Sequence, residues 1–410
     1  MTTPPARRWT LLAILTTAYG AGAFGMLGIS PLTPSLVEGF GLTRLQVALI
    51  VPSIYIGGLF CSLPGGRLAD RLGARKSLLG GLAVGAAGLV GAAAAPGFAA
   101  FLLFLVCAGI GWSVVNPALG KAIMDVFPMR ERGVAMGIKQ MGLTLGGLVG
   151  ALALPLIAAA LGWRAAILAC GVGVAVPVLA GWSSLAPLDA GAGARGDTTR
   201  SAAADWSWVR RPALLVFFAA GLLFGMVQAA VLSYLPLYAV QALGLDKIGA
   251  GVLVAWTQAG GAVSRLAFGA GSDRWLAGRR SLWLALPGAV GAVIFLVYAT
   301  STIVTPLGAG ALAFLAGVGA YGWVGIFFVI SAEIGGARQA GLLSGMAFAS
   351  IVIGLLVGPS VFGLLLVAAD SYRAAWAAFA AIATLVTLAA MLAGPAIDRE
   401  AARPSPLAAP

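Results

Sequence analysis

The sequence predicts an all-helical membrane protein of twelve spans, arranged as two copies of a six-helix unit. Only 9% of its 410 residues are charged, 60% are hydrophobic and the mean hydropathy is +1.01. A soluble protein of this length would need about a quarter of its residues charged to cover its surface. Twelve apolar runs follow one another along the chain, and motifs of the first half recur in the second.

Each predicted span contains about 20 largely apolar residues, the length that an α-helix needs to cross the hydrocarbon core. The first run follows Arg7 and Arg8 and superficially resembles a signal peptide. It is too long for one and has a counterpart in the second half, so we interpret it as the first span. The 59 glycines favour close helix packing in lipid. The predicted spans are 9–29, 46–64, 78–95, 98–120, 134–158, 164–186, 212–238, 248–270, 281–300, 304–331, 340–368 and 373–394.

The distribution of Lys and Arg predicts the orientation of the chain. With the N-terminus inside, the outer loops contain only Arg44, Arg164, Lys247 and Arg373 of the 25 basic residues. Basic residues collect in cytoplasmic loops, so both termini are predicted to be cytoplasmic, in a multi-pass protein of the bacterial inner membrane. The same rule accounts for the net charge of +12 without a nucleic-acid partner.

An internal repeat relates the two halves. Gly66–Arg71 recurs as Gly269–Arg274, 203 residues later, and Trp163-Arg164 recurs as Tyr372-Arg373, 209 residues later. Six crossings separate the copies, so they are parallel repeats about an axis along the membrane normal. The predicted domains are an N-terminal bundle at 1–188, a cytoplasmic linker at 189–211, a C-terminal bundle at 212–394 and a cytoplasmic tail at 395–410.

One loop motif carries a family resemblance. The segment Gly66-Arg67-Leu68-Ala69-Asp70-Arg71-Leu72-Gly73-Ala74-Arg75-Lys76 resembles the G-x-x-x-D-R-x-G-R-R loop between helices 2 and 3 of the major facilitator superfamily. A degenerate copy from Gly269 to Arg280 has two extra residues before its last glycine. With the topology and the linker, the resemblance covers the chain from about Arg7 to Leu392. It implies alternating access of two six-helix bundles around a midplane cavity, lined mainly by helices 1, 4, 7 and 10.

The resemblance also implies a gating role for the charges around both motif copies. Asp70 would lie against the start of helix 11 and Asp273 against helix 5, because a carboxylate favours the N-terminal end of a helix. Arg71 or Arg75 would pair with Asp125. The alternative is that these charges only set the topology. The predicted gating residues are Gly66, Asp70, Arg71, Gly73, Arg75, Asp125, Gly269, Asp273, Arg274 and Glu333.

Ionisable residues inside spans are functional candidates, because they are costly in lipid. All thirteen acids fall in loops, tails or helix ends, and the sequence has no histidine, which argues against a drug exporter with an intramembrane carboxylate. Arg265 lies in the eighth span with Gln258 seven residues earlier, and it is similar to the anion-binding arginine of oxalate and monocarboxylate porters. The alternative is a structural arginine that contacts Glu333 or helix carbonyls.

A second cation, Lys139, lies in the fifth span beside Gln140. It would supply another positive contact or carry a coupling charge; the alternative is a lysine that snorkels to the inner surface. Polar and aromatic residues on other spans complete a candidate cavity wall, unless they serve as interfacial anchors or packing residues. These wall residues are Tyr19, Trp112, Asn116, Gln228, Tyr321 and Trp323.

The residues thus predict a secondary transporter for a small organic anion, a mono- or dicarboxylate, by proton symport or anion exchange. An exporter of drugs or neutral metabolites is the alternative, although Gly142-Leu143-Thr144-Leu145-Gly146-Gly147 lacks the proline-bearing G-P-x-x-G-G run of many drug exporters. A substrate-sensing receptor or membrane scaffold is a third possibility. No catalytic carboxylate pair or nucleotide loop indicates an enzyme, and no cofactor or metal is expected. We expect a monomer whose partners are its substrate, a coupling proton or counter-anion, and lipid.

Overall fold

The computed structural model describes the backbone of residues 5–128, 131–186, 188, 211–274, 279–300 and 305–402. Within these ranges, side chains are not described at 5–6, 60–71, 132–134, 270, 273–274, 306, 332, 335–342, 344 and 401–402. The described part of the chain is helical and contains no strand. It forms two compact units, one of Met1–Thr198 with Leu245–Ala255 and the other of Thr199–Gly244 with Trp256–Pro410.

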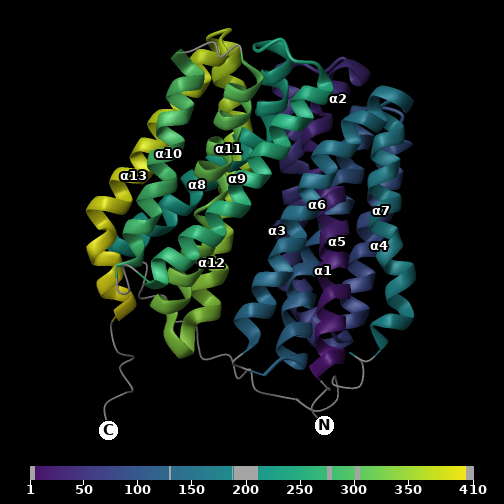
Figure 1. The fold of residues 1–410 in the computed structure, drawn as a ribbon, viewed down its shortest axis with the longest axis vertical. Coiled ribbons are helices and arrows are strands. Elements are labelled where there is room, and N and C mark those ends of the chain that lie inside the picture. Colours follow the sequence, from purple (N-terminus) through teal and green to yellow (C-terminus); the bar gives the residue numbers. More distant parts are fainter. Residues whose placement is uncertain are drawn as a thin grey trace. The chain divides into compact units, whose positions relative to one another are not determined.

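The first unit pairs helices that are distant in sequence (Figure 1, purple to blue). Its most extensive packing joins α5 to both α3 and α4, and α1 to α6, while α7 covers α4 and α1. Its elements are α1 (Pro5–Leu27), the short 3₁₀-helix η1 (Ser30–Leu32), α2 (Thr33–Phe40), α3 (Arg44–Leu72), α4 (Ala74–Ala93), α5 (Phe98–Val126), α6 (Arg132–Leu161) and α7 (Trp163–Ser184).

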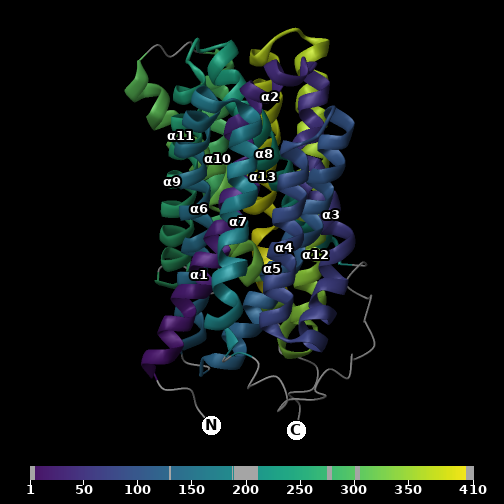
Figure 2. The same cartoon turned by 90° about the vertical axis from the view of Figure 1, so that its right-hand side faces the viewer.

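The second unit repeats this scheme (Figure 2). Here α10 packs on α13 and α8 packs on α12, as α4 and α1 pack on their partners in the first unit. The elements are α8 (Pro212–Gln241), α9 (Lys247–Arg274), α10 (Arg280–Thr300), α11 (Pro306–Tyr321), α12 (Val324–Ala368) and α13 (Tyr372–Ala402). The first turns of α9, up to Ala255, group with the first unit.

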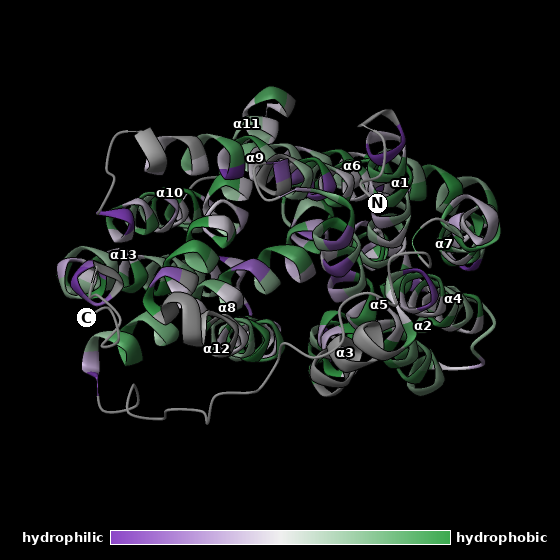
Figure 3. Cartoon of the chain, turned by 90° about the horizontal axis from the view of Figure 1, so that it is seen from below, coloured by the Kyte–Doolittle hydropathy of each residue, from purple (hydrophilic) through white to green (hydrophobic). Residues whose placement is uncertain are grey.

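Ten described segments are long and apolar enough to cross a membrane, and apolar residues predominate along the helices of Figure 3. The two other predicted spans correspond to α3 and α9. The apolar part of α3 that the structure describes, Arg44–Leu59, is shorter than a span, and α9 carries several polar side chains. Large aliphatic residues such as Leu161, Leu179 and Leu392 are more than 70% exposed, as expected where lipid is the solvent.

Equivalent glycines bring helices together in both units. A Cβ atom at Gly57 would collide with the carbonyl of Val106, and one at Gly109 with that of Ile54, so α3 and α5 touch through their backbones. In the second unit Gly260 and Gly317 have the same relation, against the carbonyls of Phe314 and Thr257. These glycines lie 203 and 208 residues after Gly57 and Gly109, the offsets of the sequence repeat. Small residues at such crossings supply the packing that lipid does not drive.

Helices extend beyond several of the predicted spans. The residues after the first span form η1 and α2 instead of a loop, and Pro31 and Pro34 each stand in the first turn, where a helix needs no backbone N–H from proline. The predicted loop 332–339 is helical, so α12 joins the apolar segments Leu307–Ser331 and Gly345–Ala368. The last helix continues to Ala402, into the predicted tail. Hydropathy marks where a helix leaves the bilayer and not where it ends.

Candidate functional site

In the first unit, three of the predicted wall residues, Tyr19, Trp112 and Asn116, come together around Lys139. Its Nζ atom donates a 2.6 Å hydrogen bond to Oδ1 of Asn116 and lies 4.9 Å from the centre of the Tyr19 ring. Tyr19 stacks on Trp112, with ring centres 5.2 Å apart and planes 6° from parallel. The cluster therefore combines a cation, an amide and an aromatic pair.

Three helices position this cluster. Trp112 and Asn116 lie one turn apart on α5, Tyr19 lies on α1 and Lys139 on α6. Glycine allows the approach of α1 to α6, since a Cβ atom at Gly142 would collide with the carbonyl of Thr16. Gly22 makes room for the indole, because a Cβ atom there would lie 2.5 Å from a carbon of the Trp112 ring.

The ammonium of Lys139 has no anionic partner among the residues that the structure describes. Lys139 is 5% exposed, which does not fit the alternative that it extends to the membrane surface. Its only described contacts are the neutral groups of Asn116 and Tyr19. A buried cation without a counter-charge is costly, and within a span such a group is expected to serve a ligand or a transported ion.

Access to the cluster differs between its members. Tyr19 and Lys139 are buried, Trp112 is half-buried and Asn116 is exposed. Because the carbonyl oxygen of Asn116 accepts from Lys139, its NH₂ group remains to donate from the exposed side. Neighbouring Gln140 is exposed, and no hydrogen bond within the described part of the chain joins it to the cluster.

In the second unit, Arg265 lies against Tyr321. Its Nε atom donates to the backbone carbonyl of Tyr321 at 3.1 Å, and its guanidinium carbon lies 5.9 Å from the centre of that ring. This contact with a helix carbonyl fits the structural alternative for Arg265, and Glu333 pairs elsewhere. Gln258 is buried on the same helix.

The other predicted wall residues of this unit lie on α8 and just before α12. The side-chain oxygen of Gln228 is buried without a hydrogen-bond partner among the described residues. The Trp323 ring stacks on Phe224 at 4.7 Å and its indole N–H donates to the Ala320 carbonyl, so this tryptophan packs instead of facing a ligand. Gln228 remains the better candidate for a polar contact.

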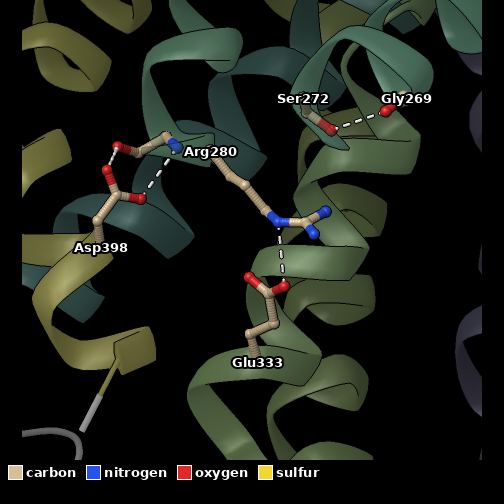
Figure 4. A network of polar contacts seen from close by, with 6 residues as sticks. Gly269, Ser272, Arg280, Glu333 and Asp398 are labelled. Carbon is tan, nitrogen blue, oxygen red and sulfur yellow. Dashed lines mark hydrogen bonds and ion pairs between the residues drawn. The ribbon is translucent and has the colours of Figure 1, made fainter. Parts of the chain in front are cut away.

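The second motif copy forms a polar network that Figure 4 shows from close by. Nε of Arg280 lies 3.1 Å from a carboxylate oxygen of Glu333 on α12. Asp398 on α13 accepts from the backbone N–H and the hydroxyl of Ser281, at 3.1 and 2.6 Å. Within the last turns of α9, Ser272 donates to the Gly269 carbonyl at 2.9 Å. The start of α10 is therefore fixed to two other helices.

The first motif copy is arranged differently. Arg75 does not pair with Asp125; it donates to the Trp182 carbonyl and lies 5.3 Å from the centre of that ring. Asp125 is 3.9 Å from Lys121, one turn earlier on its own helix. Gly73 has a φ of +84°, which favours glycine, and separates α3 from α4. The side chains of Gly66, Asp70, Arg71, Asp273 and Arg274 lie outside those that the structure describes.

Further ion pairs, which were not predicted, join helices within each unit. Arg8 pairs with Glu131 at 3.2 Å in the first unit, and Arg211 pairs with Glu400 at 2.8 Å in the second. Arg211 lies 203 residues after Arg8, the same offset as between the two copies of the loop motif. Their partners are not equivalent in the repeat, so periodicity alone did not identify them.

Comparison with known proteins shows which family the chain belongs to. The family model of the Major Facilitator Superfamily matches residues 12–359, most of the chain. The chain belongs to the major facilitator superfamily. The resemblance carried by the Gly66–Lys76 loop is thereby confirmed, together with the all-α membrane fold.

Relatives within the superfamily include anion transporters. A probable sulfoacetate transporter of Cupriavidus necator is 27% identical over 398 residues, which covers 89% of each chain. A hexuronate transporter of Bacillus subtilis is 27% identical over 156 residues, 37% of each chain. Among solved structures, a bacterial homologue of the human lysosomal transporter Spinster has a TM-score of 0.78 at 17% identity, covering 98% of this chain and all of the other. This last likeness concerns the fold alone.

Proposed function

We propose that this superfamily member is a secondary active transporter that moves a small organic anion by alternating access. The observation that carries the proposal is the buried ammonium of Lys139, hydrogen-bonded to Asn116 and without a carboxylate partner in the described part of the chain. A bound carboxylate or sulfonate would supply the missing negative charge and accept hydrogen bonds from Lys139 and from the amide of Asn116.

Two of the relatives support this chemistry. The names of two of them specify sulfoacetate and hexuronate, both small organic acids. The proposed substrates are therefore mono- or dicarboxylates and their sulfonate analogues, carried by proton symport or anion exchange. We further propose that the protein is a monomer of the bacterial inner membrane, and the distribution of basic residues supports cytoplasmic termini.

A neutral metabolite is the second candidate. The stacked pair of Tyr19 and Trp112 favours it, because aromatic faces also bind the apolar faces of uncharged ligands. With a neutral substrate, Lys139 would donate a hydrogen bond to a hydroxyl group of that substrate.

A thermal-shift screen separates the two candidates. Detergent-purified protein is heated with sulfoacetate, small mono- and dicarboxylates, hexuronates and matched neutral sugars, because a ligand that binds the native state raises the melting temperature. We expect stabilisation by at least one anion, and its loss in Lys139→Gln. Lys76→Arg, an exposed position on α4, is the control. Stabilisation by neutral compounds alone, or an unchanged anion response in Lys139→Gln, would contradict the proposal.

A further inference from the structure

Lys139 is well placed to change its protonation state during transport. Its nitrogen contacts a carbonyl oxygen of Asn116 and the face of Tyr19, and both groups accept an N–H from an amine as well as from an ammonium. The hydrogen bond to Asn116 therefore persists in either state. What differs between the states is the charge that the surroundings must stabilise.

The described charged groups on the neighbouring helices are engaged elsewhere and do not supply this stabilisation. The elements packed against α6 are α1, α5, α7 and η1, with the first turns of α9. Of their titratable side chains, only Tyr19 faces Lys139 in a described contact. Three of the other groups form ion pairs: Arg8 with Glu131, Lys121 with Asp125 and Lys247 with Glu38. Two bond to the backbone, Arg164 to the carbonyls of Ala93 and Ala95 and Asp246 to the amide of Gly249. The rest are Arg7, which is exposed, and the thiols of Cys107 and Cys170.

The residues that usually carry a transported proton are also missing from the spans. The sequence contains no histidine, and each of its thirteen acids falls outside the middle of a predicted span. An ammonium without an anion is costly in such surroundings, whereas an ammonium beside a bound anion forms a neutral pair. Proton binding and anion binding at Lys139 therefore favour each other.

We propose that Lys139 is the proton carrier of the transport cycle, so that the proton and the anion occupy one site and move in symport. This inference rests on the proposed function. As the anion enters, the neutral amine takes a proton from water on the entry side and forms a third N–H bond. When the anion leaves on the other side, the ammonium returns that proton to water, and the empty carrier reorients with a neutral amine.

The charge balance follows from this step. One proton accompanies each anion, so a monoanion crosses without net charge and a dianion crosses with one net negative charge. Anion affinity should weaken by about tenfold for each unit of pH in the range where the empty site is neutral, because binding then requires one proton.

The experiment uses the full-length protein in liposomes with the anion that the thermal-shift screen identifies. Accumulation is measured with an inward proton gradient, and exchange of labelled for unlabelled anion is measured without one. Lys139→Arg keeps a cation that stays charged at every accessible pH. We expect this variant to exchange the anion but to lose accumulation driven by the gradient. Lys76→Arg is the matched control and should accumulate the anion like the wild type.

A second measurement does not depend on a variant. Addition of the anion to wild-type protein in weakly buffered detergent solution should take up about one proton for each anion bound. Binding without proton uptake overturns the inference and leaves the proposed function intact, as does gradient-driven accumulation by Lys139→Arg at the wild-type level. Failure of every anion to bind the wild type overturns the proposed function itself.

Discussion

Arg280 pairs with Glu333 in the second unit, whereas the equivalent residues of the first unit, Arg75 and Asp125, have different partners. Arg280 follows its motif glycine by two residues, as Arg75 does, and Glu333 lies 208 residues after Asp125. The repeat therefore places the same charge types at both sites, but only one site forms the pair. In the first unit Arg75 contacts the carbonyl and the ring of Trp182 instead.

The first prediction concerns this pair. Glu333→Gln and Arg280→Gln should each lower stability by at most about 1 kcal/mol, because the pair is partly exposed and solvent screens it. The reversed pair, Arg280→Glu with Glu333→Arg, should recover most of the loss. Thermal unfolding in detergent measures both effects. Asp125→Gln is the matched change in the first unit, and it should leave the contacts of Arg75 with Trp182 unchanged. If the stability losses of the two single variants simply add in the reversed pair, Arg280 and Glu333 do not interact.

The second prediction concerns Asp398, which accepts two hydrogen bonds at the start of α10. Asp398→Ala should cost about 1 kcal/mol, the usual effect of losing a side-chain cap at a helix N-terminus. Asp398→Asn keeps one carbonyl oxygen and should lose less. Thermal unfolding in detergent shows which of the two variants is less stable. Equal stability of Asp398→Ala and the wild type would mean that the extension of α13 beyond the predicted span does not hold α10.

Much of the fold was predictable from the sequence, because composition, span length and the repeat each depend on one strong physical constraint. The solvent around the helices is lipid, so apolar runs and glycine spacing identify spans and crossings such as that of Gly57 with Gly109. Helix ends were less predictable. The helical residues 332–339 of α12 and the end of α13 lie outside the predicted apolar spans, where hydropathy carries little signal.

The candidate site was predictable in its membership and not in its contacts. Tyr19, Trp112, Asn116 and Lys139 were each identified as polar or aromatic residues on different spans. Their convergence depends on the rotation of α1, α5 and α6, which glycines such as Gly142 set through backbone contact. The burial of Lys139 is a consequence of that packing, and a sequence alone did not distinguish it from a lysine that reaches the membrane surface.

The third prediction tests the glycine crossings. Gly317→Ala should destabilise the protein by about 1–3 kcal/mol, because the new methyl group would collide with the carbonyl of Thr257 and force α9 and α11 apart. Gly80→Ala is the matched control, since it lies in a helix with no atom near the new methyl group. Its stability should equal or slightly exceed that of the wild type. Comparison of the two melting temperatures in detergent tests the crossing, and similar values would contradict it.

The fourth prediction concerns Arg265, for which the anion-binding and structural interpretations differ in measurable ways. If Arg265 contacts the substrate, Arg265→Gln should abolish anion uptake while the protein still folds, and Arg265→Lys should retain part of the uptake because it keeps the charge. If its bond to the Tyr321 carbonyl is its main role, both variants should lower the melting temperature, since that carbonyl loses its donor. Uptake in liposomes and thermal unfolding are measured on the same preparations. Because the observed bond to the Tyr321 carbonyl fits the structural role, we expect Arg265→Gln to lower the melting temperature while the folded protein keeps its anion uptake. Loss of uptake by a fully folded variant would instead assign Arg265 to the anion site.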